Sequence, residues 1–106
     1  MQFRGGMSEL MRQAARMQRK IDETRTKFQD TPVTAGAVGD KVKATVTYGG
    51  KVQKIEIDAA FLASEGIEMA LDGACAALNS ALEQSKKAME GELEKVTGGV
   101  KIPGML

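Results

Sequence analysis

The segment VTAGAVGDKVKATVTYGGKVQKIEID, residues 33–58, decides the fold of this 106-residue chain. In residues 42–48 apolar side chains at the even positions alternate with Lys and Thr, which is typical of a strand with one buried face. Gly49 and Gly50 follow and predict a two-residue primed turn, because such a turn needs residues that tolerate positive φ. Residues 51–58 then predict the returning strand of an antiparallel hairpin.

The returning strand has an irregular apolar pattern. Ile55 and Ile57 share one face and are expected to be buried, whereas Val52 is out of phase with them. A change of phase within a strand predicts a β-bulge, here near Gln53. A third, weaker strand is expected over residues 33–38, so the segment predicts a small antiparallel three-stranded sheet.

The residues before the sheet predict a long helix over about residues 7–30. Gly5 and Gly6 precede it, and Pro32 ends it because the residue before a proline is displaced from helical geometry. Apolar residues recur every seven positions and form an a/d seam, which indicates a helix packed lengthwise on another helix. The seam consists of Met7, Leu10, Ala14, Met17, Ile21, Thr24 and Phe28.

The residues after the sheet predict a second long helix over about residues 65–97. Asp58 or Ser64 is a candidate N-cap, Gly98 is the candidate C-cap, and residues 98–106 are expected to form a flexible tail. A strip of small residues on this helix would let another backbone approach closely. The strip consists of Ala70, Ala74, Ala77 and Ala81, with Gly73 beside it.

These elements predict one α+β domain, residues 1–106, in the order α-β-β-β-α. A helix of 31 residues is about 46 Å long at about 1.5 Å per residue, so three short strands cannot cover its whole apolar stripe. A two-fold homodimer would cover the rest, and so would bury the seam of the first helix. The residues expected in that dimer interface are Met7, Leu10, Met17, Ile21, Leu78, Leu82 and Met89.

The net charge of +1 conceals an uneven distribution. Residues 1–30 contain seven Lys or Arg against four Asp or Glu, and they hold all five arginines. Arg12, Arg16 and Arg19 are spaced i, i+4 and i+7 on the face opposite the seam, with Lys20 and Arg4 nearby. Guanidinium groups match phosphate geometry with paired donors, so this surface is the candidate site for binding an anion.

Two alternatives to that interpretation stay open. Any surface helix has a charged outer face, and Arg12 or Arg19 can pair with Glu9 or Glu23 on the same helix. Alternatively, the helix faces dock a protein partner without direct DNA binding. Four lysines alternate with glutamates or lie in the tail, which makes them weaker candidates for phosphate contacts: Lys86, Lys87, Lys95 and Lys101.

Several functions are not expected from this composition. The chain has no histidine and one cysteine, which excludes a disulfide framework and Cys/His metal sites. No nucleophile–base pair stands out, so no catalytic residue, metal, cofactor or small-molecule substrate is expected, and Cys75 is expected to be a small buried residue. Without an apolar run of about 20 residues or a signal peptide, a soluble cytoplasmic protein with no membrane contact is expected.

Three segments resemble the YbaB/EbfC family of bacterial nucleoid-associated proteins. They are GGMSELMRQAARMQRKIDE, VKATVTYGGKVQKIEID, and ALNSALEQSKKAMEGELEKVTGG followed by VKIPGML. The resemblance implies a tight, tweezer-shaped homodimer in the nucleoid that binds double-stranded DNA with low sequence specificity. It further implies that binding alters DNA conformation, with gene regulation or DNA protection as consequences. No DNA-reading motif carries over, so the arginine assignment rests on the physical argument above.

Overall fold

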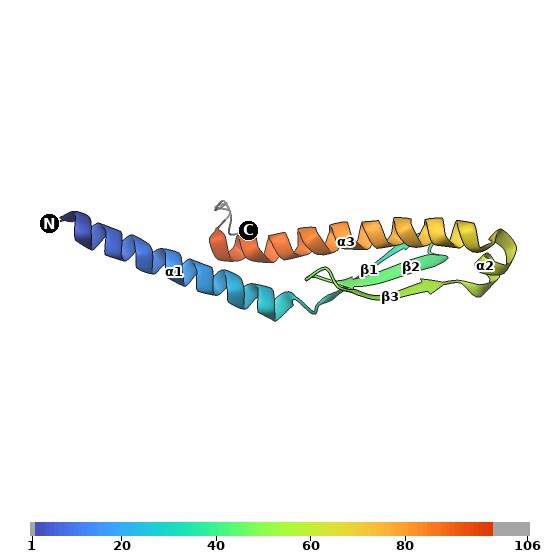
Figure 1. The fold of residues 1–106 in the computed structure, drawn as a ribbon, viewed down its shortest axis with the longest axis horizontal. Coiled ribbons are helices and arrows are strands. Elements are labelled where there is room, and N and C mark those ends of the chain that lie inside the picture. Colours follow the sequence, from blue (N-terminus) through green and yellow to red (C-terminus); the bar gives the residue numbers. More distant parts are fainter. Residues whose placement is uncertain (1, 99–106) are drawn as a thin grey trace.

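The structure is a computed structural model that describes the backbone of residues 2–98 and the side chains from residue 6 to residue 98. Lys101 and most of the expected tail lie outside the described residues. The chain forms a helix, three strands and two further helices (Figure 1), which confirms the α-β-β-β-α prediction. The elements are α1 (Gln2–Phe28), β1 (Pro32–Ala37), β2 (Val42–Thr47), β3 (Val52–Ile57), α2 (Ala59–Glu65) and α3 (Ile67–Thr97).

The three strands form one antiparallel sheet in the order β1-β2-β3. Val42, Ala44 and Val46 of the central strand are fully buried, as their alternation predicts. On the other face the hydroxyl groups of Thr34 and Thr45 are 2.8 Å apart and form a hydrogen bond across β1 and β2. The sheet therefore has one apolar face and one face of threonines and charged residues.

The prediction of a two-residue turn between β2 and β3 is wrong. The backbone N–H of Thr47 donates to the carbonyl of Lys51 at 2.8 Å, so three residues form the turn, and only Gly50 has positive φ, at 87°. Gly49 has a different role, because a Cβ there would lie 3.0 Å from the carbonyl oxygen of Gln29. The two glycines therefore satisfy two requirements, a left-handed turn residue and a close approach to the segment after α1.

The predicted bulge near Gln53 is confirmed. Thr45 pairs with Lys54 and Val46 pairs with Val52, so Gln53 is the additional residue on β3. The bulge restores the phase of β3, because directly opposed residues share a face of the sheet. Val52 therefore lies on the same side as Ile55 and Ile57.

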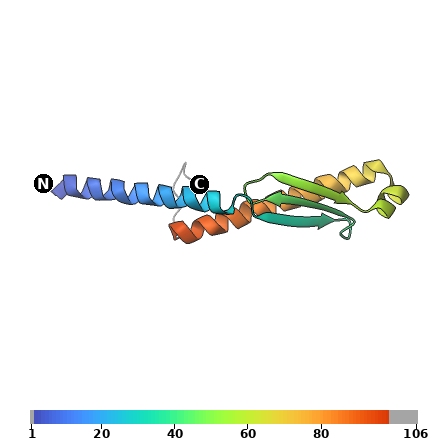
Figure 2. The same ribbon diagram turned by 90° about the horizontal axis from the view of Figure 1, so that it is seen from below.

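Helix α3 packs on the apolar face of the sheet (Figure 2). Gly73 permits the close approach, since a Cβ there would lie 2.9 Å from Cγ2 of Val42, and the small-residue strip around it is buried except for the half-buried Ala74. α3 covers mainly β1 and β2 and contacts β3 little. Ile55 is consequently 43% exposed and Val52 44% exposed, so the expected burial of Ile55 does not occur within one chain.

Helix α1 packs on α3 only through its C-terminal half. There Ile21 is fully buried and contacts a second core around Met89 and Leu93. The N-terminal half of α1 projects beyond the end of α3, away from the sheet (Figures 1 and 2), and gives the molecule a long axis of 76 Å. Gly5 and Gly6 lie inside the helix, which begins at Gln2 and ends at Phe28 instead of spanning residues 7–30.

The second long helix ends where the caps predict but begins with an interruption. Asp58 caps the short helix α2, its Oδ2 accepting from the backbone N–H of Phe61 at 2.9 Å. Gly66, with φ of 89°, then separates α2 from α3, and Gly98 forms the left-handed C-cap of α3. None of the described helices has a stretch long and apolar enough to cross a membrane.

Candidate nucleic-acid interface

The predicted arginine surface lies on the projecting half of α1. We call Arg12, Arg16 and Arg19 the arginine stripe; they span about 10 Å of helix axis. The Arg12 side chain is 68% exposed and that of Arg16 is 59% exposed, and Arg19 and Lys20 are exposed as well. Within one chain the stripe therefore faces solvent. The backbone of Arg4 belongs to α1, but its side chain lies outside the described residues.

One carboxylate partly neutralises the stripe. Glu9 places one oxygen 3.6 Å from Nη1 of Arg12 and the other 4.0 Å from Nη2 of Arg16. Exposed ion pairs of this kind contribute about 0–1 kcal/mol to stability, so they leave both guanidiniums available to a stronger anion. Arg19 forms no ion pair with the described residues, and the expected pair with Glu23 does not form.

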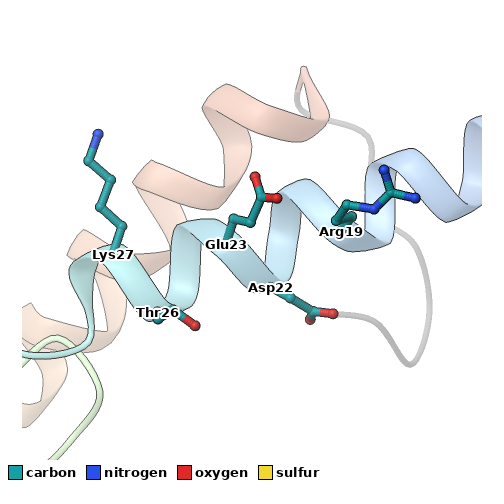
Figure 3. Close-up of a pocket in the computed structure, with 5 residues that line it drawn as sticks. All are labelled: Arg19, Asp22, Glu23, Thr26 and Lys27. Atoms are coloured by element: carbon teal, nitrogen blue, oxygen red, sulfur yellow. The ribbon is translucent and has the colours of Figure 1, made fainter.

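A shallow hollow of about 420 Å³ lies at the C-terminal end of the stripe (Figure 3). Arg19, Asp22, Glu23, Thr26 and Lys27 line it, and their side chains do not converge on one point. The hollow carries two carboxylates beside its two cations, so it does not favour a phosphate. The basic surface therefore ends near Lys20.

The lysines of α3 are engaged with neighbouring glutamates, as predicted. Nζ of Lys87 lies 3.3 Å from Glu83, and Nζ of Lys95 donates to Oε1 of Glu92 at 2.8 Å. The hydrogen bond with Glu92, reinforced by its negative charge, raises the pKa of Lys95. Lys86 is exposed and forms no ion pair with the described residues. The acidic surroundings on α3 leave the arginine stripe as the strongest anion-binding surface in the described part of the chain.

Comparison with known proteins identifies the family. Residues 3–100 match the YbaB/EbfC DNA-binding family. The chain belongs to this family, and the resemblance seen in the sequence is confirmed. It is 31% identical over 101 residues to a nucleoid-associated protein of Clostridium acetobutylicum, covering 95% of this chain and 90% of that protein. It is 35% identical over 96 residues to a nucleoid-associated protein of Agathobacter rectalis, covering 91% of this chain and 85% of the relative.

A solved structure supports the fold. The crystal structure of an uncharacterized protein from Helicobacter pylori superposes with a TM-score of 0.61, covering 74% of this chain and 90% of that chain. The two sequences are 19% identical, so this likeness concerns the fold alone.

The residues predicted for a dimer interface fall into three groups. Ile21 is fully buried and Met89 is 8% exposed, so the chain's own core uses them and little of either is left for a partner. Met7 and Leu10 are 59% and 62% exposed on the projecting half of α1. The remaining three are partly buried at the margins of the two cores: Met17, Leu78 and Leu82.

The sequence analysis missed several exposed apolar residues. Val52 and Ile55 lie on the uncovered side of β3, Leu71 is 55% exposed on α3, and Met11 is 70% exposed beside the seam of α1. The bulge was the available signal for Val52, because it places that residue on the apolar side of the strand. Cys75 is exposed, contrary to prediction, because it lies outside the row of α3 residues that contacts the sheet.

Proposed function

We propose that the protein binds double-stranded DNA with low sequence specificity, through phosphate contacts from the arginine stripes of a homodimer. One observation carries the proposal: three exposed guanidiniums lie on a helix half that projects beyond α3, in a member of a DNA-binding family. Binding of this kind would place the protein at the nucleoid. Coating or bending of DNA would in turn protect it or alter transcription.

The dimensions of the stripe suit a polyanion. Duplex DNA carries one phosphate charge per about 1.7 Å of axis, so a stripe about 10 Å long faces roughly six charges. Three guanidiniums with paired donors are enough to grip several of them. The stripe has few groups to read bases, since the side-chain amide of Gln18 already donates to Asp22 at 2.9 Å. Phosphate contacts fix position but carry no sequence information, which supports low specificity.

The uncovered side of β3 supports a homodimer. Val52 and Ile55 are more than two-fifths exposed, and no described part of the same chain covers them. Leu71 is exposed on α3, and Leu78 and Leu82 are only partly buried there. A second copy related by a two-fold axis would cover these residues and bring two arginine stripes into one particle, with the two projecting helices as the arms of a tweezer.

The test is the salt dependence of binding to unrelated DNA duplexes, measured by fluorescence anisotropy. Six stripe arginines per dimer predict a slope of about −4 to −6 in a plot of log affinity against log salt concentration. A slope near zero would reject the proposal. Similar affinities for unrelated duplexes are expected, and a strong preference for one of them would contradict low specificity.

A matched pair of variants tests the site. The variant R12A/R16A/R19A should remain a dimer and lose most of its DNA affinity, because each lost phosphate contact removes about 0.9 from the salt slope. The variant K41A/K43A/K51A removes the same charge from exposed lysines around the sheet and should retain most of its affinity. Equal losses in the two variants would show that total charge, not the stripe, controls binding. Undiminished DNA binding by the arginine variant would favour a protein partner for this surface.

A further inference from the structure

The seam of α1 continues beyond the residues that α3 covers. Its C-terminal part contacts α3, with Ile21 fully buried against Met89 and Leu93. Its N-terminal part, which we call the distal seam, consists of Met7, Leu10 and Ala14, with Met11 beside it. These four residues are exposed, and Met11 is 70% exposed. Apolar residues repeated at this spacing are typical of a helix that packs against another helix.

The residues that flank the seam change character along α1. At the e and g positions, which border an a/d seam, the distal part has Gly6, Met11, Gln13 and Gln18, none of them charged. The same heptad positions further along the helix hold three cations: Lys20, Arg25 and Lys27. Two distal seams can therefore approach each other without repulsion between like charges.

We infer that the distal seam of α1 packs against the distal seam of a second dimer, so that neighbouring dimers on DNA are joined through their projecting helices. The inference rests on the proposed function for the dimer and for DNA binding. The arginine stripe lies on the opposite side of α1, so pairing of the seams leaves Arg12, Arg16 and Arg19 exposed.

The flanking residues favour a second copy over other occupants. A membrane-surface helix carries Lys or Arg beside its apolar stripe, where the cations reach the headgroups. A face that contacts DNA or an acidic protein would also be bordered by cations. Neutral flanks match a neutral, apolar partner surface, and a second distal seam is such a surface.

The size of the contact determines when it forms. Four apolar side chains per helix bury much less than the roughly 1,200 Å² of the smaller stable interfaces, so the contact is weak between free dimers. Dimers bound side by side on DNA are held at high effective concentration, which strengthens a weak contact by orders of magnitude. The contact should therefore appear chiefly as cooperative binding to long DNA.

The experiment compares two variants that leave the net charge unchanged. M7Q/L10Q makes the distal seam polar, and S8Q/A15Q makes the same change at exposed positions away from the seam. Each is measured on a duplex that holds one dimer and on a duplex that holds many. M7Q/L10Q should match the wild type on the short duplex but lose cooperativity on the long one, with about tenfold lower affinity there. S8Q/A15Q should behave like the wild type on both.

Three results would overturn the inference. These are non-cooperative binding of the wild type to long DNA, reduced affinity of M7Q/L10Q for the short duplex, and dissociation of M7Q/L10Q into monomers in sedimentation. The second would place the seam against DNA, and the third would place it inside the dimer.

A measurement without DNA separates this inference from the proposed function. In a Cys75→Ser background, Leu10→Cys should crosslink into species larger than a dimer at high protein concentration, whereas Ala15→Cys should not. Crosslinking without DNA binding would refute the proposed function and retain the contact between seams. DNA binding without crosslinking or cooperativity would do the reverse.

Discussion

The ring of Phe28 stacks on the ring of Tyr48, with centroids 6.2 Å apart and an angle of 21° between the planes. Phe28 is the last residue of α1, and Tyr48 is the first residue after β2. Two backbone hydrogen bonds accompany the stack: Tyr48 N–H donates to Thr31 and Gly49 N–H donates to Gln29, at 2.8 and 3.0 Å. This junction sets the direction in which α1 leaves the sheet.

Replacing Phe28 should therefore destabilise the junction. Phe28→Ala removes a half-buried ring and should lower the free energy of unfolding by about 1–3 kcal/mol, less than for a fully buried ring. Phe28→Leu keeps much of the apolar volume and should cost about half as much. Urea denaturation measures both values, and equal stability of Phe28→Ala and the wild type would contradict the role of the stack.

A second prediction concerns the contact between α3 and the sheet. Gly73→Ala should destabilise the protein by about 1–3 kcal/mol, because its Cβ would lie 2.9 Å from Val42 Cγ2 and either α3 or the sheet must shift. Gly91→Ala on the same helix is the control, since its Cβ would meet no described atom within 4 Å. The control should stabilise the protein by about 0.5–1 kcal/mol through helix propensity. Thermal unfolding of both variants tests this opposite sign.

Neutralising Glu9 should strengthen DNA binding. Glu9→Gln frees Arg12 and Arg16 from their shared carboxylate, so DNA affinity should rise about two- to fivefold at low salt. Glu83→Gln makes the same charge change on α3, where it frees only Lys87, and should have a smaller effect. Anisotropy titrations compare the two, and an equal gain from both would indicate that net charge alone matters.

The uncovered side of β3 gives a prediction about assembly. V52Q/I55Q should convert the dimer to a monomer, because it places two polar amides in the proposed interface. K54Q/E56Q alters the opposite face of β3 without changing net charge and should remain dimeric. Sedimentation measures the masses. The monomer should also show about half the salt slope of the dimer, since it carries three stripe arginines instead of six.

The sequence predicted best those elements whose signal is local. The strand alternation around Val46, the bulge at Gln53 and the C-cap at Gly98 each depend on a few adjacent residues, and the structure has all three. Helix α2 was missed because seven residues are too few for a helical period to stand out from the capping signal of Asp58. The turn at Gly50 was assigned the wrong type, because the need for a small residue at Gly49 arises from its contact with Gln29.

The candidate site was predictable only in part. The spacing of Arg12, Arg16 and Arg19 predicts their common face, and the structure leaves that face exposed within one chain. Periodicity identifies apolar residues but does not say which surface buries them. Ile21 and Leu10 belong to the same seam, yet the first is fully buried in the chain and the second is 62% exposed. That difference depends on where α3 ends relative to α1, which is a property of the whole fold.

The partly covered sheet ties this protein's action to its abundance. In the proposed dimer, each chain lends its neighbour the apolar cover that its own α3 does not supply to β3. A cell that makes too few copies would therefore hold single chains with greasy flanks and only one row of guanidiniums. Gene dosage would then switch DNA occupancy steeply, since losing the second row weakens the grip by a power of the salt concentration.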